Sequence, residues 1–346
     1  MHLFNPPASK ALACLSSIRR AVLVLGGIAL LALPWASRAA DLPSAAHSLL
    51  DGNNDNAVAQ LKQILASDSS NGQAHLLLCR AYYAQSMASA AAAECAAALR
   101  TLANDSSAQD WAGRAFGMQA DSSGPIAGLR LAFKVRNAFE AAVRLNPLNG
   151  DAVNDLSEYY IDAPSIVGGG FEKAALLADR SQSQLPQNAH RMRAMAAEKQ
   201  KDYGTAEREF HAAAAVANRP NAWADLGAFY SRRTQPDKAV EALRRAILLD
   251  HVHDATLVDA ATTLTEINRE PRFAERALRD YLASHSKSDA APAFKVHVML
   301  AKLLRDEGNT ADAKIELEHS LELASGYAPA RRELAAIEHE ETIAER

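Results

Sequence analysis

The chain has 346 residues, of which 49% are hydrophobic, only 6% are aromatic, and 74 are alanine. Alanine is the strongest helix former, whereas Gly and Pro, with 16 and 13 copies, are scarce, so the composition predicts a mostly α-helical protein. The charged fraction of 23% beside this apolar content excludes wholesale disorder. The net charge of −4 argues against a general nucleic-acid binder, which requires a basic face.

Residues 1–39 have the organisation of a secretory signal peptide. Basic residues in positions 1–20 precede an uncharged apolar run at 21–33, Pro34 ends the run, and Ser37 and Ala39 are the small residues of a cleavage site. The run of 13 residues is shorter than the ~20 that span a bilayer. We therefore expect a periplasmic or secreted protein without stable membrane insertion after cleavage, with an uncleaved N-terminal anchor as the alternative.

From residue 40 onwards, an apolar pattern recurs eight times. A small residue is followed by an apolar one four positions later and by a small or apolar one three positions after that, which places all three on one helical face. The central members are spaced 32 to 44 residues apart. The eight copies are Ala57/Leu61/Ile64, Ala91/Cys95/Ala98, Val135/Phe139/Ala142, Ala174/Ala178/Ser181, Ala206/Phe210/Ala213, Ala239/Leu243/Ala246, Ala274/Leu278/Tyr281 and Ala313/Leu317/Ser320.

A second helical pattern precedes these copies, and it is clearest in Trp223, Leu226, Gly227 and Tyr230. Together with the copy at 239–246, it resembles the tetratricopeptide repeat at each of its characteristic positions. The resemblance covers roughly residues 41–336. It implies an all-α fold, a right-handed α-α superhelix of about eight helix hairpins plus a C-terminal capping helix, in which each hairpin buries its apolar face against its neighbours.

The repeats suggest a division into four segments: a signal peptide at 1–39, N-terminal repeats at 40–149, central repeats at 150–283, and the last repeat with its cap at 284–346. The third copy carries an interruption at 120–125, and the fourth carries a longer one at 162–170. The segment 284–292 before the last repeat is polar, and we expect it to be mobile.

The sequence offers little that points to catalysis, a cofactor or a metal. No nucleophile motif is present, and the repeats leave no room for a catalytic domain, so we do not expect an enzyme. His75 and His297 occupy the large-residue position of their repeats and are interpreted as packing residues. Gly168–Gly170 precede a helix, so their amides are either part of a structural turn or an anion contact.

Cys79 and Cys95 fall on the two facing helices of the second hairpin. In an exported protein such a pair favours a disulfide, with two buried thiols as the alternative.

By the geometry of the tetratricopeptide family, the first helices line the concave side of the superhelix. The predicted lining is mildly basic, which favours an acidic or C-terminal segment of a partner protein. We therefore expect a protein-binding scaffold in cell-envelope assembly or secretion; the alternatives are a small-anion or glycan module and a structural homo-oligomer, and the oligomeric state stays open. The candidate groove residues are Leu76, Arg80, Tyr83, Asn154, Glu158, Ser231, Arg232, Val298, Lys302 and Arg305.

Overall fold

The computed structural model describes residues 41–344, and within them it contains 17 α-helices, one short 3₁₀ helix and no strand. This confirms the predicted all-α helical repeat superhelix. The proposed signal peptide and its cleavage site lie outside the described residues. In the described part of the chain, no helix combines the length and apolar character needed to cross a membrane.

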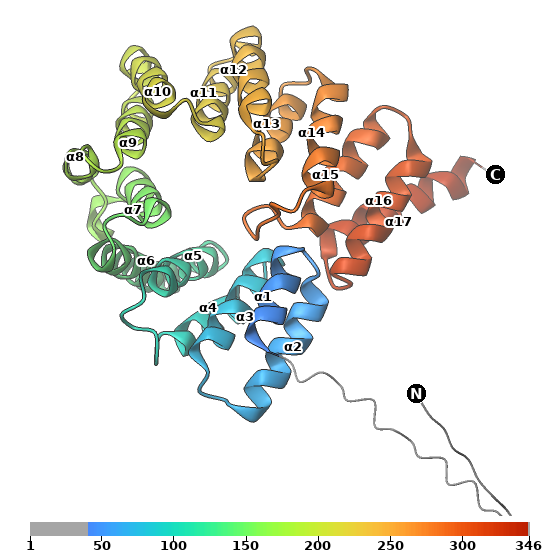
Figure 1. Cartoon of the computed structure of the whole chain (residues 1–346), viewed down its shortest axis with the longest axis horizontal. Coiled ribbons are helices and arrows are strands. Elements are labelled where there is room, and N and C mark those ends of the chain that lie inside the picture. Colours follow the sequence, from blue (N-terminus) through green and yellow to red (C-terminus); the bar gives the residue numbers. More distant parts are fainter. Residues whose placement is uncertain (1–40, 345–346) are drawn as a thin grey trace, which may run out of the picture. The chain divides into compact units, whose positions relative to one another are not determined.

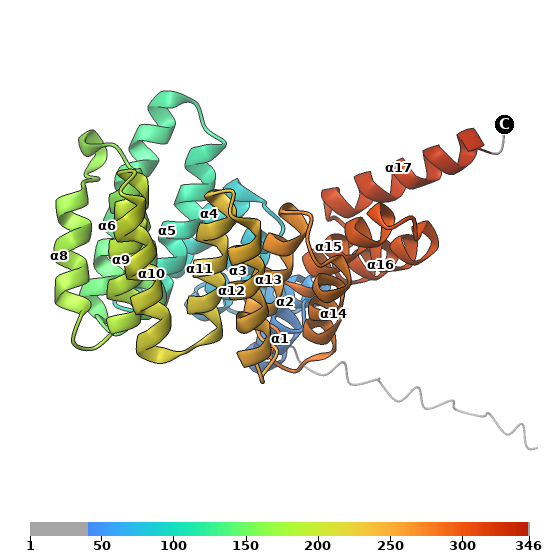
Figure 2. The same cartoon turned by 90° about the horizontal axis from the view of Figure 1, so that it is seen from above.

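Sixteen of the helices pair in chain order into eight hairpins, and α17 (Ala328–Ala344) follows the last of them. The hairpins are α1 (Leu42–Leu50) with α2 (Asn54–Ser67), α3 (Gly72–Ala84) with α4 (Ala88–Ala98), α5 (Ser106–Asp121) with α6 (Pro125–Leu145), α7 (Gly150–Asp162) with α8 (Phe171–Ser181), α9 (Pro186–Lys199) with α10 (Tyr203–Ala217), α11 (Pro220–Arg232) with α12 (Pro236–Leu249), α13 (Ala255–Glu266) with α14 (Pro271–Ala283), and α15 (Ala293–Asp306) with α16 (Thr310–Leu323). In the view from above, α17 lies at the opposite end from α8 (Figure 2).

The recurring pattern marks where helices touch. Of its 24 positions, all on the second helices of the hairpins, Ile64 alone is not fully buried. Small residues at these positions let two helices approach closely, which explains the alanine content. Helix starts are equally regular, because a terminal Asp or Asn side chain accepts a hydrogen bond from the helix, or a proline stands in the first turn.

The third hairpin absorbs its extra residues as helix rather than as loop. Its two helices are 16 and 21 residues long, and only Ser122–Gly124 separate them. Gly113 lets Phe139 pack against the helix axis, since a Cβ at this position would lie 2.4 Å from the phenyl ring. The predicted interruption at 120–125 therefore lengthens the hairpin instead of opening it.

In the fourth hairpin, residues 163–170 form a tight connection that includes the 3₁₀ helix η1 (Ser165–Val167). Gly168 and Gly170 have φ angles of +98° and +152°, a region that favours glycine. Gly169 is required for a different reason, because a Cβ there would lie 1.8 Å from the carbonyl oxygen of Ala163.

We predict that Gly169→Ala destabilises the protein by about 1–3 kcal/mol, because neither of the two clashing backbone segments can move without breaking the turn. The matched control is Gly117→Ala inside α5, where the added Cβ meets only Val135 at 4.0 Å. That change replaces a helical glycine and should stabilise the chain by roughly 0.5–1 kcal/mol. Denaturant unfolding of the two variants measures both values, and equal stabilities would contradict the steric argument.

The segment 284–292 is held in place, which corrects the expectation that it is mobile. Tyr281 donates a hydrogen bond of 2.6 Å from its hydroxyl to the carbonyl of Ala291 and accepts one of 3.0 Å from the amide of Ser288. Asp289 forms an ion pair of 2.6 Å with Arg80 in the second hairpin. The polar composition of the segment thus serves specific contacts.

The same segment brings the first and last hairpins together (Figure 1). In addition to the Arg80–Asp289 pair, Asp55 in α2 accepts a hydrogen bond of 2.8 Å from the amide of Ser325, which follows α16. At Gly52 a Cβ would lie 2.6 Å from the Cβ of Ala293, so the two ends of the repeat array are in close contact. The described helices therefore follow an arc that closes on itself.

Candidate functional site

A cavity of about 800 Å³ lies along the inner side of this arc, against five successive first helices. Each helix contributes residues spaced three or four apart, and this spacing defines a single face of each helix. The main contributors are Asp151 and Asn154 of α7, Asn188 and Arg191 of α9, Asn221 and Asp225 of α11, Asp259 and Thr262 of α13, and Lys295 and Met299 of α15.

Arg191 organises the middle of the cavity wall. Its Nε lies 3.1 Å from Asp225, and one of its terminal nitrogens lies 2.9 Å from Glu158. Burial opposes the charged guanidinium, but the two carboxylates outweigh it and raise the pKa of Arg191. Beside it, the Asn188 side-chain amide donates a hydrogen bond of 3.0 Å to the side-chain oxygen of Asn154. These contacts connect α7, α9 and α11 across the wall.

Asp259 and Lys295 line the same cavity, and neither forms an ion pair within residues 41–344. The surrounding protein, with a contribution from the carboxylate of Asp225, raises the pKa of Asp259 to about 6. Burial lowers the pKa of Lys295. Both shifts have the same cause, because the cavity withholds water from charged groups. The wall therefore offers one acidic and one basic group to a molecule of complementary charge.

The predicted groove residues are distributed over three environments. Asn154 lines the cavity, and Glu158 contacts it through Arg191. Leu76 and Val298 are only 4% and 5% exposed, so their prediction as groove residues is corrected. They lie one position beyond the large residue of their helices, and there the neighbouring hairpin covers them. Tyr83 packs edge-to-face on Trp111, and Ser231 is half-buried at the end of α11.

The four basic residues predicted to line the groove all pair with carboxylates. Lys302 and Arg305 both contact Glu333 of α17, at 3.2 and 2.9 Å. Arg232 contacts Glu198 at 2.8 Å, and Arg80 contacts Asp289 as described above. Their charge is therefore neutralised, and the expected basic groove is replaced by a cavity of mixed charge.

The residues that the sequence prediction missed follow a simple rule. Most of them lie two positions before or two positions after the large residue of the first helix. Asn188 and Lys295 precede His190 and His297, whereas Asp225 follows Trp223 in this way. An offset of two turns a side chain about 200° around the helix, away from the face that packs on the second helix. The register of the repeat was sufficient to find them.

The glycines at 168–170 form a turn whose amides are all in use. The amide of Gly168 donates to the carbonyl of Ser165, that of Gly169 to Pro164, and that of Gly170 to Tyr160. Cations occupy the neighbouring carbonyls, since Lys173 donates to Gly168. The observation favours the structural turn over the anion contact.

The structure joins Cys79 and Cys95 by a disulfide between α3 and α4, with their Cα atoms 5.2 Å apart. Both residues are fully buried within the second hairpin. The bond links the first and second helix of one repeat.

The comparisons with known proteins agree with the repeat pattern. Residues 294–327, which include most of the eighth hairpin, match the model of the tetratricopeptide repeat. A search of the curated proteins found no match.

Solved structures show the same fold class. Yeast Tom70 is 16% identical with a TM-score of 0.50, over 85% of this chain and 60% of that chain. A Cut9–Hcn1 structure, described as an APC/C hetero-tetramer, is 14% identical with a TM-score of 0.37, over 86% and 55%. A tetratricopeptide repeat protein from Parabacteroides merdae ATCC 43184 is 12% identical with a TM-score of 0.44, over 86% and 96%. The chain thus spans about 55–60% of the length of the first two proteins.

Eight stacked hairpins with a cavity along their first helices define a helical repeat solenoid. With the sequence match in the last hairpin, the chain belongs to the tetratricopeptide repeat family.

Proposed function

We propose that this protein is a non-enzymatic scaffold that binds an extended segment of a partner protein in the cavity along its first helices. The observation that supports this most strongly is the cavity wall, because five successive helices each present the same face to it. A wall built in this way is long and regular, which suits a chain-like ligand with a repeating backbone. Its asparagine and threonine side chains could hydrogen-bond to the amides and carbonyls of such a segment.

The free charges of the wall suggest what the segment carries. A basic side chain would meet Asp259, and a carboxylate would meet Lys295. In each case the ligand supplies the charge that the poorly hydrated wall lacks, and this gain contributes most to specificity. We therefore propose a segment with both a basic and an acidic residue, rather than the purely acidic one that the sequence favoured.

We further propose that the protein works outside the cytoplasm, in cell-envelope assembly or secretion. This rests on the signal-like organisation of residues 1–39 and on the cysteine pair, which is typical of oxidising compartments. Cleavage after Ala39 would leave 33 basic and 41 acidic side chains, a net charge of −8.

Site-specific photo-crosslinking in intact cells tests the cavity proposal. A photoreactive residue at Met299 lies on the cavity wall, whereas one at Ile126 is exposed near the start of α6 and outside the cavity. We expect a partner to crosslink from position 299 and not from position 126. Crosslinks of equal intensity from both positions would contradict the proposal.

A charge reversal then tests whether the cavity groups take part. We expect Lys295→Glu to weaken binding of the crosslinked partner by at least tenfold, because losing one member of a desolvated charge pair costs about 2 kcal/mol or more. The matched control is Lys62→Glu, which makes the same charge change on an exposed part of α2. Calorimetric titration with the purified partner measures both, and equal affinities for the two variants would contradict the role of the cavity.

A further inference from the structure

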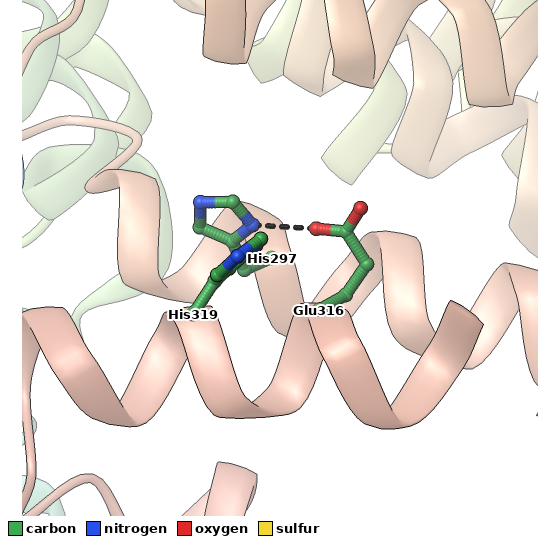
Figure 3. Close-up of side chains that lie close together, drawn as sticks. All are labelled: His297, Glu316 and His319. Carbon is green, nitrogen blue, oxygen red and sulfur yellow. Dashed lines mark hydrogen bonds and ion pairs between the residues drawn. The ribbon is translucent and has the colours of Figure 1, made fainter. Parts of the chain in front are cut away.

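Three side chains with metal-binding atoms meet in the last hairpin. His297 comes from α15, and Glu316 and His319 come from α16 (Figure 3). One possible ligand atom from each residue lies within 4.8 Å of the other two. His297 Nδ1 and a Glu316 oxygen are already 2.6 Å apart.

Two of these three residues belong to a contact that recurs along the chain. The pair His75–Glu94 is 2.6 Å apart in the second hairpin, and His190–Glu209 is 2.7 Å apart in the fifth. In all three hairpins the histidine Nδ1 faces a glutamate that lies 19 residues later. The recurring pair therefore connects the two helices of a hairpin, and by itself it points to no metal.

The third residue distinguishes the last hairpin from the other two. The position 22 residues after the histidine is Ala97 in the second hairpin and Ala212 in the fifth, but it is His319 in the last. Because Glu316 and His319 are three residues apart on one helix, their side chains project from the same face. His319 is exposed, whereas Glu316 is buried, so the cluster is accessible to solvent from one side.

These groups suit a divalent transition metal. Zinc is bound by imidazole nitrogens at about 2.0–2.1 Å and carboxylate oxygens at about 2.0–2.2 Å, and three protein ligands leave a fourth position for water. Arg279 lies 3.3 Å from Glu316, so a metal ion would compete with it for this carboxylate. Arg279 also pairs with Glu275 at 2.8 Å, so its charge keeps a partner when Glu316 turns to the metal.

We propose that His297, Glu316 and His319 form a binding site for one divalent transition-metal ion of the zinc class. The metal replaces the direct His297–Glu316 hydrogen bond, which opens by a few tenths of an ångström as both atoms become ligands. It links α15 to α16 in the hairpin that precedes the terminal helix. The site is independent of the proposed protein-binding cavity.

Calorimetric titration of the untagged full chain with zinc chloride tests this proposal. We expect one equivalent to bind, and we expect His319→Ala to weaken binding at least tenfold while leaving the helix content unchanged, because His319 is exposed. No binding to the unmodified chain would overturn the proposal. Binding that survives His319→Ala would also overturn it, since the metal would then be held elsewhere, for example at His251 and His253.

The fifth hairpin provides a test by construction. Ala212→His supplies the missing third residue beside His190 and Glu209, at the position that His319 occupies in the last hairpin. We expect the Ala212→His variant to bind a second equivalent of zinc, and the Ala212→His/His319→Ala variant to bind one. If Ala212→His adds no binding, the geometric argument fails and the proposal with it.

Discussion

Removing the Cys79–Cys95 disulfide is expected to lower the free energy of unfolding by about 3 kcal/mol. The bond closes a loop whose ends are 16 residues apart, and in the chain-entropy model a loop of about 15 residues contributes roughly that amount. The hairpin it closes also lies next to the site where the two ends of the repeat array meet. Its loss should therefore weaken the first hairpins before the central ones.

Reduction and substitution separate the effect of the bond from that of packing. Both cysteines are fully buried, so Cys79→Ala/Cys95→Ala also removes two sulfur atoms from the core. Reduction of the unmodified chain breaks the bond and keeps both sulfurs. We expect most of the loss to occur on reduction alone, with a smaller further loss in the double variant, as measured by denaturant unfolding.

Counting reactive thiols in denaturant, before any reductant is added, gives the direct test. The full-length sequence contains three cysteines, so the pair leaves only Cys14 to react. We expect one reactive thiol in the full-length chain and none in a chain that begins after Ala39. Three reactive thiols in the full-length chain would show that the bond is absent.

The fold was predictable because its determinants are local and repeated. A small residue, an apolar residue four later and another three later identify the packed face of each second helix, and burial at these positions follows directly. The closure of the arc was not predictable in this way. Arg80 and Asp289 are 209 residues apart, and nothing in either repeat indicates that the ends of the array meet.

The candidate site was predicted only in outline. The repeat register indicated that the first helices line an inner surface, and Asn154 was placed there correctly. The chosen offsets, however, also selected Leu76 and Val298, which the neighbouring hairpins bury. The charge of the surface was wrong for a further reason, since a basic residue such as Lys302 acquires its partner, Glu333, from the next helix of the array. Such pairings depend on stacking and are not local in the sequence.

A second large effect is expected at Arg114, which lies between two carboxylates where α5 meets α7. Its nitrogens lie 3.2 Å from Asp110 and 2.5 Å from Asp155, and its guanidinium packs over the ring of Trp111 at 4.9 Å. Only 4% of the Asp110 side chain is exposed. We predict that Arg114→Leu destabilises the protein by about 3 kcal/mol at pH 8, because it leaves two poorly hydrated carboxylates without a cation.

The pH dependence distinguishes this electrostatic loss from a loss of packing. Burial, together with the nearby carboxylate of Asp155, raises the pKa of Asp110 from 3.8 to about 7, although Arg114 opposes the shift. The folded state therefore binds more protons than the unfolded state between these values. The stability that Asp110 contributes is complete below about pH 4 and is lost as the pH rises through 7.

Removing Arg114 strengthens this dependence, since the remaining effects on Asp110 all raise its pKa. We expect the penalty of Arg114→Leu to be clearly smaller at pH 5, where Asp110 is protonated, than at pH 8, where it must be charged or take up a proton on folding. The control is Asp110→Asn/Arg114→Leu, which has no charge to bury at position 110 and should recover part of the loss at pH 8 but little at pH 5. Denaturant unfolding at the two pH values measures all of these variants. A loss from Arg114→Leu that is equal at both pH values would mean that its packing on Trp111, and not its charge, holds α5 against α7.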